Sequence, residues 1–126
     1  MEFTLKEVLE RGFGEGIETL AECRTLPAEA ACKVARIWKK IRAEAIAWVK
    51  ASEARKEEFE KTFTADATEA SKQVARLQFN KALEQESETT TFEVKVSPID
   101  FTQLSEARLS PSMIASLEKI LTNLPE

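Results

Sequence analysis

The sequence predicts an α+β fold that is mostly α-helical: a long antiparallel helical hairpin, a small antiparallel β-sheet and a C-terminal helix. Three observations predict it. Residues 28–63 lack glycine and proline and are rich in helix-favouring Ala, Glu, Lys and Arg. Residues 92–96 alternate apolar and polar side chains, as a half-buried antiparallel strand does. Ser110-Pro111 joins a capping residue to a proline at the first helical position. The length and the absence of a long linker place residues 1–126 in a single domain.

Residues 1–24 are predicted to form a short strand, a glycine turn and a short helix. Phe3 and Leu5 alternate with polar residues, which favours a strand. The three glycines then fall together within residues 12–16, and such a cluster interrupts regular structure. Because the cluster lacks the Gly-Lys-Ser/Thr ending of a P-loop, we expect a turn there and no phosphate site.

Two helices are predicted to form the hairpin. The first covers residues 27–63, begins at Pro27 and would be roughly 50 Å long at 1.5 Å per residue. The second, the return helix, covers residues 66–86, because Asp66 followed by Glu69 resembles a capping box. The apolar stripe expected to face the first helix consists of Ala67, Ala70, Val74 and Leu77.

The C-terminal part is predicted to hold a β segment at residues 90–101 and a helix at residues 110–122. Phe92, Val94 and Val96 are expected to point inward, and the residues between them outward. The stripe that would bury the last helix consists of Met113, Ile114, Leu117, Ile120 and Leu121.

Composition narrows the possible functions. The chain has no histidine, and its two cysteines are nine positions apart, which fits no zinc or redox motif. We therefore expect no catalytic residue, no cofactor and no metal, and we expect the protein not to be an enzyme. The net charge of −4 disfavours nucleic acid as a partner. The first residues carry charge and no long apolar run, so we expect no membrane association.

The long helix carries the candidate protein interface. A basic run from Lys33 to Arg42 is followed by an acidic half from Glu53 to Glu60. Such runs are typical of solvated helix faces, but two helices with this layout would also pair antiparallel. Trp38 and Trp48 suit either a core or an interface. We expect self-association or an obligate partner through a set of residues comprising Lys33, Arg36, Ile37, Trp38, Lys40, Ile41 and Trp48.

Three stretches carry a resemblance to a known family. They are a Leu26-Pro27 start that runs on to Lys40-Ile41, a stretch from Phe79-Asn80-Lys81 through Leu83 that leads to Phe92–Val96, and an Ile99–Leu104 stretch followed by Leu109-Ser110-Pro111 and a helix to Leu121. In these the chain resembles a family of small, functionally uncharacterised proteins of long-tailed bacteriophages. The resemblance implies a phage protein in the virion or in the cytoplasm of the infected bacterium, and it implies no catalytic residue.

Two hypotheses follow for function. The first is a non-enzymatic bacteriophage protein that contacts itself or another phage protein, as a minor virion component or an assembly factor. The alternative is a phage-encoded inhibitor of a host defence or transcription protein, since small acidic domains can mimic the charge of nucleic acid.

Overall fold

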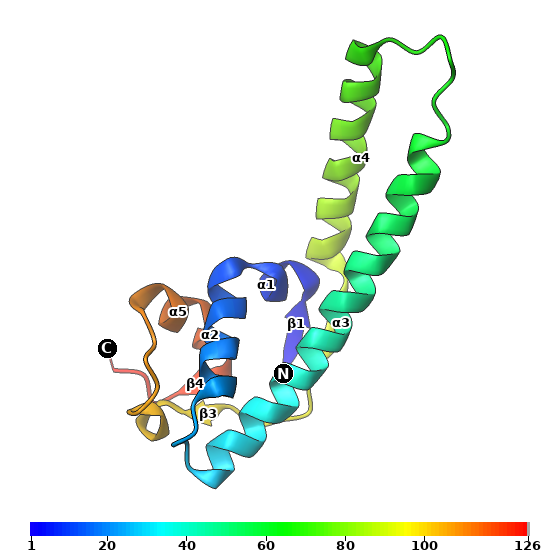
Figure 1. The fold of residues 1–126 in the computed structure, drawn as a ribbon. Coiled ribbons are helices and arrows are strands. Elements are labelled where there is room, and N and C mark those ends of the chain that lie inside the picture. The colour runs from blue at the N-terminus through cyan, green and yellow to red at the C-terminus, as the bar shows by residue number, and fades with distance from the viewer. Residues whose placement is uncertain (126) are drawn as a thin grey trace.

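The computed structural model describes residues 1–125 and is mostly α-helical with two small two-stranded sheets (Figure 1). The predicted α+β, mostly α fold class is therefore confirmed. In chain order the elements are β1 (Glu2–Thr4), α1 (Leu5–Leu9), α2 (Arg11–Glu22), α3 (Ala28–Glu60), α4 (Glu69–Thr89), β2 (Thr91–Glu93), β3 (Ile99–Asp100), the 3-10 helix η1 (Phe101–Leu104), α5 (Pro111–Ser116), the 3-10 helix η2 (Glu118–Ile120) and β4 (Leu121–Thr122).

The first strand is shorter than its alternating pattern predicts, because a helix cap ends it at Thr4. The Glu7 backbone N–H donates to the Thr4 hydroxyl, and the Thr4 N–H donates to the Glu7 carboxylate, each over 3.2 Å. This reciprocal capping box satisfies two backbone donors at the start of α1. Leu5 and Val8 then bury their side chains as one helical face.

The predicted glycine turn is wrong, because helix α2 runs through residues 12–16. Its glycines have a packing role instead. A Cβ at Gly16 would lie 2.7 Å from Cδ1 of Leu117, and one at Gly12 would lie 2.5 Å from the hydroxyl oxygen of Ser116. Both neighbours lie in or directly after α5, so the absence of side chains lets α2 and the end of α5 approach each other closely.

Helix α3 is confirmed as the long helix, and it ends three residues before the predicted boundary at residue 63. Its N-terminal half lies against α2 and buries a stripe facing the core, whereas its C-terminal half leaves the body beside α4 (Figure 1). The buried stripe consists of Ala30, Val34, Ile37 and Ile41.

Helix α4 begins at Glu69, later than predicted, because the cap is Thr68 and not Asp66. The Ser71 N–H donates to the Thr68 hydroxyl oxygen over 3.1 Å. The helix continues to Thr89, three residues beyond the predicted end at residue 86.

The predicted contact face of α4 is also wrong. Val74 is 55% exposed and Leu77 is 66% exposed, so their stripe faces solvent. The α3 side of α4 is formed instead by Phe79, which stacks on Phe59 with ring centroids 4.4 Å apart, and by the buried Leu83. Large aromatic rings, not the predicted stripe of Ala67, Ala70, Val74 and Leu77, therefore fill the space between the two helices.

Ion pairs add to the hairpin contact. The Arg76 guanidinium donates twice to the Glu60 carboxylate, over 2.7 and 2.9 Å, and Arg55 donates to Glu86 over 2.6 Å. The Arg76 guanidinium holds the pKa of Glu60 below its usual range, mainly through these hydrogen bonds. Because these groups are exposed, we expect them to orient the helices more than to stabilise them.

Replacing Phe79 by alanine is expected to loosen the hairpin and not the body. Loss of the ring pair should speed amide exchange roughly tenfold at the C-terminal end of α3 and the N-terminal end of α4, because mainly exposed ion pairs would then join the two helices there. Hydrogen exchange followed by mass spectrometry measures this. Gln78→Ala on the exposed side of α4 is the matched control and should change nothing; equal acceleration in both variants would contradict the contact.

The β segment follows its predicted alternation. Strands β1 and β2 pair antiparallel, with Phe3 opposite Phe92. Val94 is buried, Phe92 and Val96 are half-buried, and the residues between them are exposed. The second sheet departs from the predicted antiparallel arrangement, because β3 and β4 pair parallel, with Ile99 opposite Leu121.

The C-terminal helix starts as predicted but ends early. Ser110 accepts a hydrogen bond from the Met113 N–H, with Pro111 in the first turn. Helix α5 stops at Ser116, and the remainder of the predicted range 110–122 forms η2 and β4. This break turns the chain so that Leu117, Ile120 and Leu121 all enter the core.

The elements outside the hairpin share one hydrophobic core with the N-terminal half of α3, and together they form the body of the protein. The fully buried members of this core come from β1, α2, α3, β3 and the C-terminal segment, and the largest are Phe3, Leu20, Ile37, Ile99, Leu117 and Ile120. The hairpin extends beyond this core (Figure 1). None of the helices in residues 1–125 has the length and apolar character that crossing a membrane requires.

Candidate protein-binding surfaces

Two residues of the predicted interface belong to the core. Ile37 has no exposed surface, and Ile41 is 6% exposed. Both lie on the α3 stripe that meets the body, since they continue the spacing of Val34. Their assignment to an interface is therefore wrong.

The basic residues of the predicted interface are largely engaged within the chain. Lys33 donates to the Pro98 carbonyl oxygen over 3.1 Å and lies 3.3 Å from Glu29. Lys40 pairs with Glu44 over 3.0 Å, and Arg36 is exposed. Pairs between residues four apart on one helix are what a solvated helix face shows. The run from Lys33 to Arg42 thus resembles the solvated alternative more than a continuous contact strip.

The two tryptophans are both half-buried but lie in different places. Ten residues of helix leave them about 80° apart around the axis. Trp38 lies beside α2, with the Arg42 guanidinium 5.1 Å from its ring centroid. Trp48 lies in the groove between α3 and α4, beside Leu83. They therefore do not form one surface.

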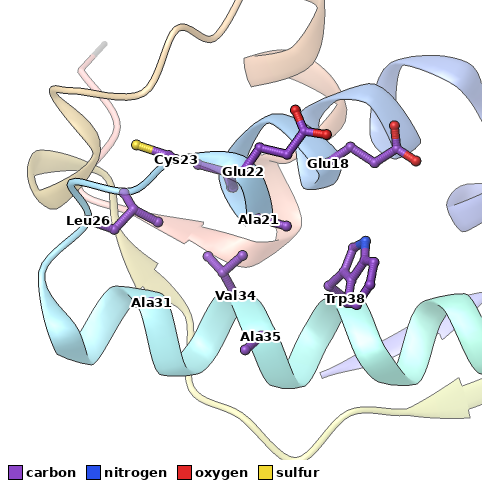
Figure 2. A pocket seen from close by; sticks show the side chains of 10 residues that line it. Glu18, Ala21, Glu22, Cys23, Leu26, Ala31, Val34, Ala35 and Trp38 are labelled. Carbon is purple, nitrogen blue, oxygen red and sulfur yellow. The ribbon is translucent and has the colours of Figure 1, made fainter.

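A cleft of about 500 Å³ lies between the C-terminal half of α2 and the N-terminal half of α3 (Figure 2). We call it the α2/α3 cleft. On the α3 side the cleft is deepened by the small side chains of Ala31 and Ala35, and the Trp38 side chain bounds it at one end. Glu18 and Glu22 extend from α2 along the other side. The cleft thus combines an apolar floor with an acidic rim.

The acidic rim carries unneutralised charge. Within residues 1–125, neither Glu18 nor Glu22 forms an ion pair, and both are exposed. A smaller cleft of about 340 Å³ lies on the far side of Trp38 and shares Glu18 with the first. Apolar space therefore continues along the α2–α3 junction past the indole.

A second surface is the outer face of α4, defined by Ala70, Val74, Leu77 and Lys81. Spacings of four, three and four residues place these side chains on one side of the helix, away from Phe79 and Leu83. Ala70 and Lys81 are exposed like the two larger residues between them. Lys81 forms no ion pair within residues 1–125. This face is apolar and positively charged, whereas the rim of the α2/α3 cleft is acidic.

The remaining candidates for catalysis or metal binding are carboxylates and thiols. Asp100 accepts hydrogen bonds from the hydroxyl and N–H of Thr102, which hold its pKa below the usual range and cap η1. Both cysteines are free thiols. Among residues 1–125, His, Cys, Asp and Glu side chains form no group of three or more that would hold a metal ion. The absence of metal, cofactor and catalysis stays a prediction.

Comparison of the chain with protein-family models, curated proteins and solved structures found no match.

Proposed function

We propose that this chain is a non-enzymatic bacteriophage protein that acts by protein–protein contact, as a minor virion component or an assembly factor. The observation that carries the contact role is the outer face of α4. Val74 and Leu77 are the two most exposed large apolar residues, and they lie side by side on a hairpin that extends beyond the core (Figure 1). Neighbouring exposed apolar side chains on an extended element are typical of surfaces that bind a partner.

The α2/α3 cleft supports the same proposal. Its apolar floor is open to solvent, and Trp38 supplies the kind of large, half-buried side chain that is enriched in protein interfaces. The candidate contact elements are therefore α4, Trp38 and the cleft beside it, and the basic run of α3 takes a smaller part than predicted.

The phage context rests on the resemblance of the sequence. Two of the stretches that carry it stand at helix starts, since Pro27 precedes the first residue of α3 and Ser110 caps α5. The sites proposed for contact involve Trp38, Lys81 and neighbouring positions, which lie within or beside those stretches.

Mass spectrometry of purified virions tests the role. We expect the wild-type chain at a constant copy number per virion or, for an assembly factor, in purified assembly intermediates. Leu77→Glu should be depleted from these particles at least about tenfold, because it places a charge in an apolar contact. Ala82→Glu, an exposed change to the same residue on the same helix but away from the outer face, should be incorporated normally.

A different outcome favours the alternative. Absence from virions and intermediates, together with a host defence or transcription protein whose activity falls on addition of the chain, would identify an inhibitor. The unpaired carboxylates of Glu18 and Glu22 are the groups that would meet a basic surface of such a host protein.

A further inference from the structure

We propose that the chain binds a second copy of itself head to tail, with the outer face of α4 of one copy docked in the α2/α3 cleft of the next. This inference rests on the proposed contact function and names the partner as the same chain. It assigns an occupant to two surfaces that intramolecular packing leaves uncovered.

The two surfaces match in length. From Val74 to Lys81 the outer face of α4 extends about 10 Å along its helix, and from Ala31 to Trp38 the cleft extends about 10 Å along α3. On α4, the side chains of Val74 and Leu77 project into solvent. In the cleft, the floor opposite α2 includes the small side chains of Ala31 and Ala35. Two apolar side chains one helical turn apart therefore fit in length into a cleft that extends over one to two turns of α3.

The two surfaces also match in charge. Lys81 lies one turn beyond Leu77, on the same side of α4. Glu18 and Glu22 lie one turn apart on the rim of the cleft (Figure 2). None of the three forms an ion pair within the described part of the chain. With Leu77 in the cleft, the ammonium group of Lys81 reaches a rim that holds two carboxylates.

A symmetric contact between two α4 helices satisfies these groups less well. If the outer faces met antiparallel about a point between Val74 and Leu77, Lys81 would lie beside Ala70 of the second copy. The nearest carboxylate there, that of Glu69, already lies 3.7 Å from Lys72, and Glu18 and Glu22 would stay unpaired. The observed charges therefore favour the contact between unlike surfaces.

A head-to-tail contact has a consequence for assembly. Each copy offers one α4 face and one cleft, so every dimer leaves one of each free. Further copies add until the chain of copies closes into a ring or is left open as a filament. The proposed contact involves only about two helical turns of each copy, so we expect an affinity in the micromolar range that gains strength in a closed or templated assembly.

Two variants that block opposite surfaces test the proposal by analytical ultracentrifugation of the full chain. Leu77→Glu blocks α4, and Ala31→Trp fills the cleft; both positions are exposed, so circular dichroism melting should be unchanged. The wild type should form a concentration-dependent series of species at high micromolar concentration. Each variant alone should associate at least about tenfold more weakly. An equimolar mixture should form a one-to-one dimer and nothing larger, because one intact α4 face and one intact cleft remain.

Matched controls and a charge exchange complete the design. Ala82→Glu, on the flank of α4, and Ala43→Trp, on the outward side of α3, should associate as the wild type does. Lys81→Glu and Glu18→Lys/Glu22→Lys should each weaken association a few-fold, and the three changes combined in one chain should restore it.

The outcomes separate this inference from the proposed function. A wild type that is monomeric at high micromolar concentration overturns the head-to-tail contact, and so does association that Leu77→Glu abolishes but Ala31→Trp does not affect. If the chain is nevertheless incorporated into virions, the contact function stands with a different partner. Association that behaves as expected, without any virion or assembly role, supports the contact and contradicts the proposed function.

Discussion

Replacing Val94 by lysine is expected to lower the free energy of unfolding by about 2–4 kcal/mol. Val94 is 4% exposed, and its N–H donates to the Met1 carbonyl oxygen over 2.8 Å, which holds the strand in place beside β1. A lysine ammonium group at this position would enter the apolar core without a partner or pull the strand outward. Urea unfolding followed by circular dichroism measures the loss.

The neighbouring position supplies the control. Lys95 is exposed on the opposite side of the same segment, so Lys95→Val should change the free energy of unfolding by less than about 0.5 kcal/mol. Similar losses for the two variants would mean that the inward and outward sides of this segment have been assigned incorrectly.

The elements that the sequence predicts best are those with strong local signals. The absence of glycine and proline over the long helix, the alternation around Val94 and the Ser110-Pro111 cap each depend on near neighbours in the chain. The structure has all three. The capping box of Thr4 and Glu7 is also a local signal, but the alternation of Phe3 and Leu5 concealed it.

The errors come from distant neighbours. Gly12 and Gly16 disfavour a helix locally, and the close approach of α5 that explains them involves residues about a hundred positions later. Helix α4 has two partial apolar stripes, one with Val74 and Leu77 and one with Phe79 and Leu83. Spacing alone does not tell which stripe meets α3. The stacking of Phe79 on Phe59 decides it.

The same limit applies to the candidate site. Trp38, one of the residues of the predicted interface, is half-buried beside the α2/α3 cleft, and its role in an interface stays a prediction. The predicted interface also includes Ile37 and Ile41, because the sequence does not show that other elements of the chain cover this side of α3. Glu18 and Glu22 are absent from the predicted interface, because only the packing of α2 beside α3 brings them to the rim of a cleft (Figure 2).

Replacing Gly16 by alanine is expected to lower the free energy of unfolding by about 1–2 kcal/mol, although alanine favours a helix by about 1 kcal/mol. The new Cβ would lie 2.7 Å from Cδ1 and 3.0 Å from Cγ of Leu117, a side chain with no exposed surface. Gly14→Ala in the same helix meets nothing within 4 Å and should stabilise by about 0.5–1 kcal/mol. Thermal unfolding of both variants compares them. Stabilisation by both would show that α2 does not approach Leu117 closely, and destabilisation of similar size by both would show that the glycines belong to a turn after all.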